Sequence, residues 1–415
     1  MNGPANNNKA KATSHVQPQL FAPWPYFSPD EISAAARVLE SGKVNYWTGN
    51  EGRQFELEFA QFVGCQYGVA VANGTVALEL ALRALGVEPG DEIITASRTF
   101  IASASCAVAV GARPACADVD RNSGNITADT IRKVCTPATK AIVAVHLAGW
   151  PCEMDPILEL AREKGLRVVE DCAQAHGATY KGNRVGSLGD VAAFSFCQDK
   201  IMTTAGEGGM VTTNSYDLWQ RMWSYKDHGK NYDSVYRPAE KLGFRWLHHS
   251  FGTNWRLSEV QSAVGRVALR KLPGWVAARR RNAARLTERL QQTPGLRIPT
   301  VPEHVGHAYY KYYVYVEQKA LPRGWDRDRI CQAIAARGVP CATGSCSEVY
   351  LEEAFPHRWR PRNRCAIARE LGESSLMFLV HPTLTEANID CTSEVVRRVM
   401  LQATRAQSRT AFAGI

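Results

Sequence analysis

The sequence predicts an α/β protein that has a large domain with a mostly parallel, mixed sheet and a smaller C-terminal α+β domain. From about Gly68, apolar segments of strand length alternate with segments of helical spacing, and such strands belong in a sheet covered on both faces. After about Leu272 the alternation gives way to an arginine-rich helix, proline-punctuated segments and an aromatic strand. We therefore predict a disordered leader at residues 1–20, a large domain at residues 21–271 and a small C-terminal domain at residues 272–415.

The predicted elements follow one another at short intervals. The first is a helix that begins after the N-cap residue Ser28 and ends at Gly42. Beyond it, short apolar runs predict strands and runs with helical spacing predict helices. The predicted strands cover residues 68–72, 91–96, 112–120, 141–147, 166–172, 191–196, 208–214 and 309–316. The predicted helices cover residues 75–85, 101–110, 154–165 and 326–338.

The composition is that of an ordinary globular protein, with 45% hydrophobic and 21% charged residues among 415. The net charge of +9 is concentrated in arginines of the C-terminal half, most densely at residues 275–286. A nucleic-acid patch is one interpretation of such a cluster. The apolar residues in it recur at helical spacing and no aromatic stacking platform accompanies it, so we predict a solvated helix face and no nucleic-acid partner. A basic surface also attracts phosphorylated substrates.

The cysteines indicate the compartment. Twelve cysteines are scattered without CxxC pairs or zinc-type spacing, and several lie in apolar stretches. This pattern predicts free thiols in the reducing cytoplasm and no metal site. No apolar run approaches the length of a membrane span, and the N-terminal residues lack the apolar core of a secretion signal. We therefore predict a cytoplasmic protein without a membrane partner.

One lysine stands out because of where it follows a strand. Lys200 comes five residues after Ser195, and Ser195 alternates with Phe194 and Phe196 in an apolar strand and so points away from them. In sheets of this kind ligands gather at the carboxyl ends of the strands. Lys200 is either an ordinary solvated cation on a turn or a nucleophile held beside a bound anion.

Four further residues occupy comparable positions. Gly74 and Thr75 lie between a strand and a helix, where backbone N–H groups suit a phosphate, although the same pair is typical of a plain N-cap. Asp171 ends an apolar strand, where a carboxylate needs a partner, and a buried cap or an ion pair would also account for it. Phe100 follows another strand, and core packing alone would explain it.

In their order and spacing these residues resemble the DegT-type family of sugar aminotransferases, which have a type I aminotransferase fold. The motifs that carry the resemblance include "VANGTVALELALRALGVEPGDEIITASRTFIASA", "VVEDCAQAHGATYKG", "GSLGDVAAFSF" and "GTNWRLSEVQSAVG", and they extend along nearly the whole chain. The resemblance implies pyridoxal 5'-phosphate as the cofactor, with pyridoxamine phosphate as its intermediate form. It also implies a type I aminotransferase fold here.

The resemblance implies a role for each residue around the cofactor ring. Lys200 would bind the cofactor aldehyde covalently and then move protons between the cofactor carbon and the substrate carbon. Asp171 would pair with the protonated ring nitrogen, which keeps the ring an electron sink. Gln174 would lie near the ring oxygen, and Phe100 would stack on one face of the ring.

The cofactor phosphate is assigned in the same way. The resemblance implies that Gly74, Thr75 and Ser195 hold it from one subunit. Asn254, in "GTNWRL", would reach it from a second subunit. We therefore expect a homodimer with shared active sites.

The chain departs from the family pattern in three places. The segment "TTAGEGG" at residues 203–209 carries one extra residue, "KDHGK" at residues 226–230 replaces the commoner "RNHG", and Trp150 stands where many relatives carry a polar residue. Trp150, His228 and Tyr309 are candidates for the substrate pocket. Each is equally interpretable as a structural residue.

The predicted function is transfer of an amino group from glutamate or glutamine to a keto sugar in amino-sugar biosynthesis, with a nucleotide-linked keto-deoxy sugar as the acceptor. Transamination of a free cyclitol ketone, such as an inosose, is an alternative that the sequence does not separate from it. A non-catalytic regulatory relative is a second alternative, against which the presence of Lys200 and Asp171 speaks. A dehydratase of the same fold has a histidine in place of the lysine. A dinucleotide-dependent dehydrogenase is disfavoured because no GxGxxG opens a helix.

Overall fold

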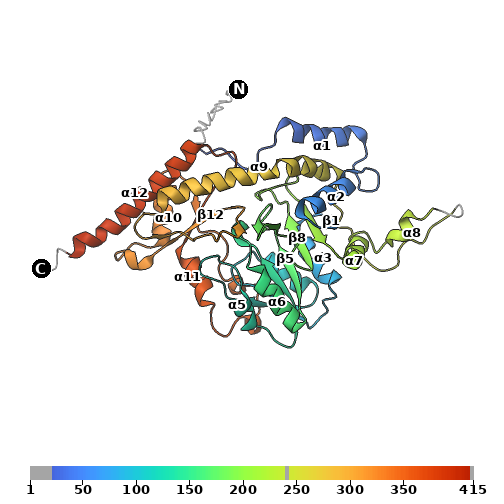
Figure 1. Ribbon diagram of the computed structural model, residues 1–415, viewed down its shortest axis with the longest axis horizontal. Helices are drawn as coiled ribbons and strands as arrows, with labels where there is room; N and C mark the ends of the chain where they lie inside the picture. Colours follow the sequence, from blue (N-terminus) through green and yellow to red (C-terminus); the bar gives the residue numbers. More distant parts are fainter. Residues whose placement is uncertain (1–20, 239–242, 412–415) are drawn as a thin grey trace, which may run out of the picture.

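Figure 1 shows the computed structural model, which describes residues 21–238 and 243–411. The predicted leader at residues 1–20 lies outside the described residues. Among the residues that are described, no helix is long and apolar enough to cross a bilayer. All twelve cysteines are free thiols, and half of them are buried.

The large sheet has seven strands, and its mixed character was predicted correctly. In sheet order they are β1 (Tyr67–Val71), β9 (Gly209–Thr213), β8 (Val191–Ser195), β5 (Arg167–Asp171), β4 (Thr139–Val145), β2 (Glu92–Ala96) and β3 (Arg113–Ala117). Only β9 runs against the others in this sheet. The carboxyl ends of β2, β5 and β8 therefore meet along one edge of the sheet.

Two smaller sheets are antiparallel throughout. One belongs to the C-terminal region and contains, in order, β10 (Leu296–Arg297), β12 (Tyr312–Val316), β14 (Ser375–Phe378) and β13 (Cys341–Ala342). The other contains β11 (Val305–Gly306), β6 (Thr179–Tyr180) and β7 (Asn183–Arg184), and it joins the two halves of the chain.

Helices surround the sheets. They are α1 (Pro29–Ser41), α2 (Glu51–Val63), α3 (Gly74–Ala84), α4 (Ala102–Ala109), α5 (Ala128–Arg132), α6 (Met154–Lys164), α7 (Tyr216–Lys226), α8 (Tyr232–Tyr236), α9 (Glu259–Leu290), α10 (Arg327–Ala335), α11 (Ala366–Ser374) and α12 (Glu386–Ala411). Four short 3-10 turns lie at Leu147–Gly149, Gln318–Ala320, Val349–Leu351 and His357–Trp359. The predicted helix at the start is confirmed as α1, with Ser28 in a capping box and Gly42 in the left-handed conformation after it.

The long helix α9 connects the two regions (Figure 1). Leu272 and Val276 pack with residues of the large region, whereas Ala283 and Leu286 belong to the core of the C-terminal region. The predicted boundary between residues 271 and 272 thus falls inside one continuous helix. The division into two domains stays a prediction.

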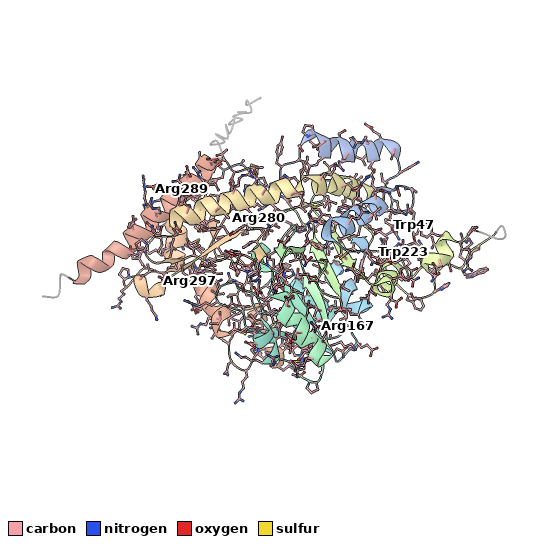
Figure 2. The ribbon with its side chains drawn as sticks, in the orientation of Figure 1. Trp47, Arg167, Trp223, Arg280, Arg289 and Arg297 are labelled. Atoms are coloured by element: carbon pink, nitrogen blue, oxygen red, sulfur yellow. The ribbon has the colours of Figure 1, made fainter. Side chains whose placement is uncertain are left out.

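The arginines of α9 mostly hold the fold together. Arg285 and Arg289 form ion pairs with Asp390 of α12, at N–O distances of 2.6 and 2.9 Å. Arg280 donates to the backbone carbonyl of His307, 2.8 Å away; Figure 2 labels Arg280 and Arg289 along the helix. The prediction of a solvated face is wrong for Arg279, which is 2% exposed because it packs beneath the ring of Trp24.

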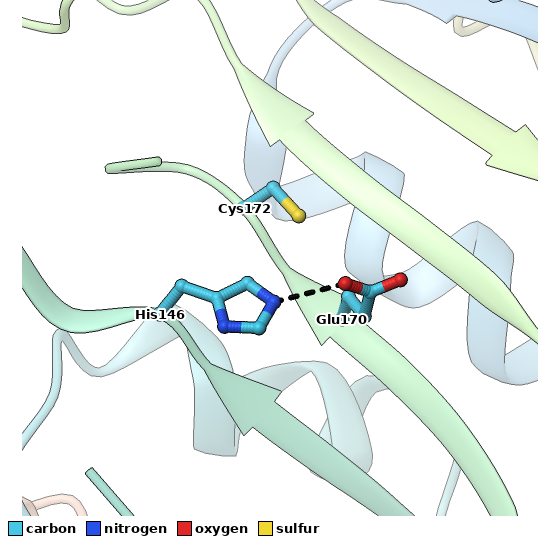
Figure 3. Close-up of side chains that lie close together, drawn as sticks. All are labelled: His146, Glu170 and Cys172. Carbon is cyan, nitrogen blue, oxygen red and sulfur yellow. Dashed lines mark hydrogen bonds and ion pairs between the residues drawn. The ribbon is translucent and has the colours of Figure 1, made fainter. Parts of the chain in front are cut away.

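A buried polar cluster fixes the end of β5. His146, Glu170 and Cys172 lie close together at the ends of β4 and β5 (Figure 3), with ligand atoms within 4.8 Å of one another. The backbone N–H of Cys152 donates to His146 Nδ1 at 2.9 Å, so the proton is on Nε2, which donates to Glu170 at 3.0 Å. Burial raises the pKa of the Cys172 thiol well above its usual value.

The carboxylate of Glu170 is fully used by hydrogen bonds. Besides His146, the backbone N–H groups of Gly186, Leu188 and Gly189 donate to it, each at 2.8 Å. Burial alone would raise the pKa of Glu170, but the bonds from His146 and the backbone lower it below the usual value. The cluster therefore anchors the loop before β8 to β5 and stabilises the sheet edge.

Replacing Glu170 by Gln removes the charge but keeps the shape. We expect Glu170→Gln to lower the free energy of unfolding by about 2 kcal/mol at pH 7, because a neutral amide satisfies fewer of the four donors. Urea unfolding followed by circular dichroism measures this change. Glu40→Gln on the exposed face of α1 is the matched control, and it should leave stability unaltered.

The same pair gives a pH test. Because the folded-state pKa of Glu170 is lowered, its contribution is complete above the unfolded value of about 4.3 and is lost as the pH falls through the folded value. The difference in stability between the wild type and Glu170→Gln should therefore shrink below about pH 4. A difference that stays constant down to pH 3 would contradict this account.

Candidate active site

An open cleft lies at the carboxyl edge of the large sheet, between it and strand β12. Its empty space, open solvent included, is about 1850 Å³. The lining residues that carry the argument below are Gly74, Thr75, Phe100, Ser103, Asp171, Gln174, Ser195, Asp199, Lys200, Tyr310, Lys311 and Tyr313. Seven of the predicted cofactor residues therefore line a single cleft.

The N-terminus of α3 lies directly on the end of β8. Asn73 caps the helix, since its Oδ1 accepts from the Val76 N–H at 3.0 Å. A Cβ added to Gly74 would lie 2.5 Å from the Cβ of Ser195, so no other residue fits at this point without a shift. The Thr75 side chain is exposed in the cleft. Free N–H groups and hydroxyls at a helix start form a ready site for a phosphate.

Asp171 is buried at the end of β5, and each of its two carboxylate oxygens accepts one hydrogen bond. Ser103 Oγ donates to Oδ2 at 2.7 Å, and the Ala173 N–H donates to Oδ1 at 3.1 Å. Thr99 is within hydrogen-bond distance of Ser103, at 2.8 Å, and extends the chain. The carboxylate is thereby oriented, and it keeps the capacity to accept a further proton donor from the cleft.

Lys200 lies on the turn after β8, as predicted. Its backbone carbonyl accepts from Trp24 Nε1 at 2.8 Å, which holds the turn in place. Its Nζ lies 5.1 Å from the centre of the Tyr310 ring, and the hydroxyl of Tyr310 donates to Asp199. Lys311 lies 4.7 Å from the same ring, and burial lowers its pKa. The two lysines therefore flank one aromatic ring.

Phe100 and Gln174 also line the cleft. Phe100 is 65% exposed, which is unusual for its size and leaves one face of the ring free. The alternative of core packing for Phe100 is thereby wrong. The Oε1 atom of Gln174 accepts a hydrogen bond from the Ala148 N–H at 2.7 Å. The side-chain NH₂ group of Gln174 is therefore directed away from Ala148.

Asn254 and His228 lie apart from the cleft of their own chain. Both are exposed, and the His228 N–H donates to the Thr253 carbonyl at 2.9 Å. Asn254 forms an isolated bridge with Asp227. In the same segment, Lys226 is buried and pairs with Glu56 at 2.6 Å, so the "KDHGK" departure serves the fold at this position.

Trp150 and Tyr309 line a second, narrower cavity rather than the cleft. Trp150 is 6% exposed and packs against His307, whose ring stacks on Tyr309 with centroids 3.8 Å apart. Tyr313 lines both spaces, so the cavity adjoins the cleft at this residue. Trp150 and Tyr309 thus line the cavity that adjoins the cleft, not the cleft itself.

Several cleft residues escaped the sequence analysis. Ser103 has a local signal, since it follows Thr99 by one helical turn and so faces the same side. Asp199, Tyr310 and Lys311 have a weaker one. Asp199 precedes Lys200, whereas Tyr310 and Lys311 belong to the aromatic segment more than 100 residues later. Only the folded chain brings these two segments together.

These residues fit the cofactor that the sequence resemblance implies. A phosphate matches the helix start at Gly74 and Thr75, a protonated ring nitrogen matches the oriented carboxylate of Asp171, and an aldehyde matches the amine of Lys200. The free face of Phe100 suits a flat aromatic ring. The chemistry of the group and of the cleft therefore agree at each point.

Comparison with known proteins identifies the family. A sequence model of the DegT/DnrJ/EryC1/StrS aminotransferase family matches residues 25–399. The solved structure of an aminotransferase from Psychrobacter cryohalolentis is 54% identical, with a TM-score of 0.91, and the match covers 92% of this chain and 99% of that one.

Two curated relatives are named for nucleotide sugars. UDP-N-acetyl-3-dehydro-alpha-D-glucosamine 3-aminotransferase of Acidithiobacillus ferrooxidans is 35% identical, over 90% of this chain and 96% of the relative. GDP-perosamine synthase of Caulobacter vibrioides is 36% identical, over 86% of this chain and 95% of the relative. Aminotransferases of this family depend on pyridoxal phosphate. The chain belongs to the DegT/DnrJ/EryC1/StrS aminotransferase family and is an aminotransferase.

Proposed function

We propose that this protein binds pyridoxal phosphate in the cleft and transfers an amino group from glutamate or glutamine to a nucleotide-linked keto sugar, in amino-sugar biosynthesis. The observation that carries the proposal is the meeting of Lys200, Asp171 and the α3 N-terminus in one cleft. The relatives named for UDP- and GDP-linked sugars support the substrate class. The free thiols support a cytoplasmic location.

The cofactor is held at its two ends by different parts of the sheet edge. Gly74, Thr75 and Ser195 would bind the phosphate through backbone N–H groups and hydroxyls. Asp171 would accept a hydrogen bond from the ring nitrogen, and Ser103 fixes the direction of its carboxylate. When bound, the ring supplies an electron sink for the carbon next to the amino nitrogen.

Lys200 carries out the proton transfers. Its side chain extends from the turn after β8 into the cleft. There its amine would move a proton between the substrate carbon and the cofactor carbon. Lys311 and Tyr310 lie beside it in the cleft. Phe100 would cover one face of the ring and leave the other to substrate.

A homodimer with shared sites is part of the proposal. Asn254 is exposed and outside its own cleft, as a residue that serves a second subunit must be. The segment before it carries large exposed rings, with Trp246 82% and Phe251 100% exposed. Exposed apolar groups of this size are typical of an interface.

Replacement of Lys200 tests the chemistry. We expect purified wild-type protein with pyridoxal phosphate to absorb visible light, and glutamate to bleach that band. Lys200→Ala should lose the band and at least about 1000-fold of the turnover, since it removes both the covalent attachment and the proton carrier. Lys311→Ala, which removes the other lysine of the cleft, should keep the band. Unchanged turnover in Lys200→Ala would refute the mechanism.

Replacement of Gly74 tests the phosphate site. In Gly74→Ala the new Cβ forces α3 away from Ser195, so the affinity for pyridoxal phosphate should fall about 10- to 100-fold, measured by titration of the cofactor-free protein. Gly274→Ala in α9 is the control, because its Cβ meets nothing within 4 Å and a helical alanine is favourable. Equal affinities for both variants would contradict the phosphate assignment.

Mixing two inactive variants tests the shared site. Lys200→Ala and Asn254→Asp remove residues that we assign to different subunits of one site. After dissociation and reassociation, hybrid dimers should hold one intact site, and about a quarter of wild-type activity should return. Lys200→Ala mixed with Ser195→Ala is the control, because both residues belong to the same subunit and no site is rebuilt. Absence of recovery in the first mixture would refute the exchange of Asn254.

A further inference from the structure

Arg98 is buried without a partner. It follows β2, its side chain is 0% exposed, and Nε, Nη1 and Nη2 donate no hydrogen bond to any residue that the structure describes. Its guanidinium carbon lies 5.5 Å from the centre of the Tyr313 ring. An arginine cannot shed its charge in a protein, so burial leaves this cation in need of an anion.

The other fully buried arginine shows the contrast. Arg279 donates through Nη1 to the carbonyl of Tyr310 at 3.1 Å and lies over Trp24. Burial lowers its pKa to about 9. Among the described residues Nε and Nη2 of Arg279 also lack a hydrogen-bond partner, so the fold satisfies Arg279 in part, whereas it satisfies none of the three side-chain nitrogens of Arg98.

The guanidinium faces the narrow cavity that Trp150 and Tyr309 line. No acidic side chain is among its lining residues, which are chiefly aromatic and neutral. The hydroxyl of Tyr312 is engaged with Thr287 at 2.9 Å. The cavity therefore offers one strong cation in apolar surroundings, which is an environment that strengthens a charge-assisted bond.

The cavity adjoins the cleft. Tyr313 lines both, and the Ala148 N–H of the cavity wall donates to Gln174 of the cleft at 2.7 Å. Along the chain, Arg98 is followed directly by Thr99 and Phe100, which line the cleft. A group attached to a molecule bound in the cleft is therefore within the neighbourhood of Arg98.

We propose that Arg98 marks a subsite for a carboxylate of the substrate, an inference that rests on the proposed aminotransferase function. A planar carboxylate matches the guanidinium fork and fits a narrow space with a single cation. A phosphate would need further cations or a helix start, and the cavity lining has neither. The carboxylate comes from the amino donor, which always carries one, or from a keto sugar that bears an acid group.

Replacement by methionine separates binding from folding. Arg98→Met removes an unpaired buried charge and keeps an apolar chain of similar length, so the melting temperature should stay the same or rise. Its glutamate half-reaction, followed without any sugar as bleaching of the visible band, should need at least about 10-fold more glutamate than wild type. Binding of glutarate to the cofactor-free protein, measured by calorimetry, should weaken by a similar factor.

Two further variants complete the design. Arg98→Lys keeps the charge without the fork, so it should recover part of the affinity and remains informative if Arg98→Met does not fold. Arg297→Met is the matched control, since Arg297 also lies over a tyrosine ring, that of Tyr315 at 4.4 Å, but does not line the cavity. It should bind glutamate and glutarate like wild type.

The outcomes distinguish the sources. A weaker glutamate half-reaction in Arg98→Met assigns the subsite to the donor. An unchanged one, with weaker transfer to a keto sugar that bears a carboxylate, assigns it to the acceptor and also supports the subsite. Unchanged glutarate binding with both half-reactions intact would overturn the proposal. Failure of the wild type itself to bleach with any amino acid would instead reject the proposed function, and glutarate binding would still report on Arg98.

Discussion

The site depends on the close approach of helix α3 to strand β8 at Gly74 and Ser195. The distance of 2.5 Å to a Cβ placed on Gly74 means that the helix start reaches the strand end only because this position has no side chain. Since β8 is hydrogen-bonded to β5, the same contact brings the helix start close to Asp171. The turn that follows β8 then carries Lys200 into the space between them. One contact therefore sets three sides of the cleft.

Two adjacent acidic residues of strand β5 have different roles, one in the fold and one in the proposed site. Glu170 and Asp171 are consecutive, so their side chains lie on opposite faces of the sheet. Glu170 accepts from four donors and has no capacity left for a ligand, whereas Asp171 accepts from two and lines the cleft. The number of remaining hydrogen-bond positions separates a structural charge from a functional one. None of the side-chain donors of Arg98 is used within the described residues, so by this measure Arg98 resembles the functional carboxylate of Asp171.

The sequence predicted most of what local pattern determines. The strands that end at Asp171 and Ser195 and the helix that starts at Gly74 lie where apolar spacing placed them, because spacing reports which residues are buried. Spacing does not report which element buries them. Three features depend on contacts between segments that are distant along the chain. They are the antiparallel direction of β9, the position of Trp150 in the adjoining cavity, and the absence of a hydrogen-bond partner for the Arg98 side chain among the described residues. These features required the folded structure.

The shape of the cleft follows from the way in which α9 is buried. This helix enters the core of the large region through Leu272 and Val276 and the core of the C-terminal region through Leu286, without a break. A large movement of β12 against the sheet edge would open one of these close-packed cores, which is costly. Tyr310 and Lys311 are therefore held opposite Lys200 by folding itself. We therefore expect the side chains that line the cleft and its neighbouring cavity to select among substrates, more than any movement of the C-terminal region against the large sheet.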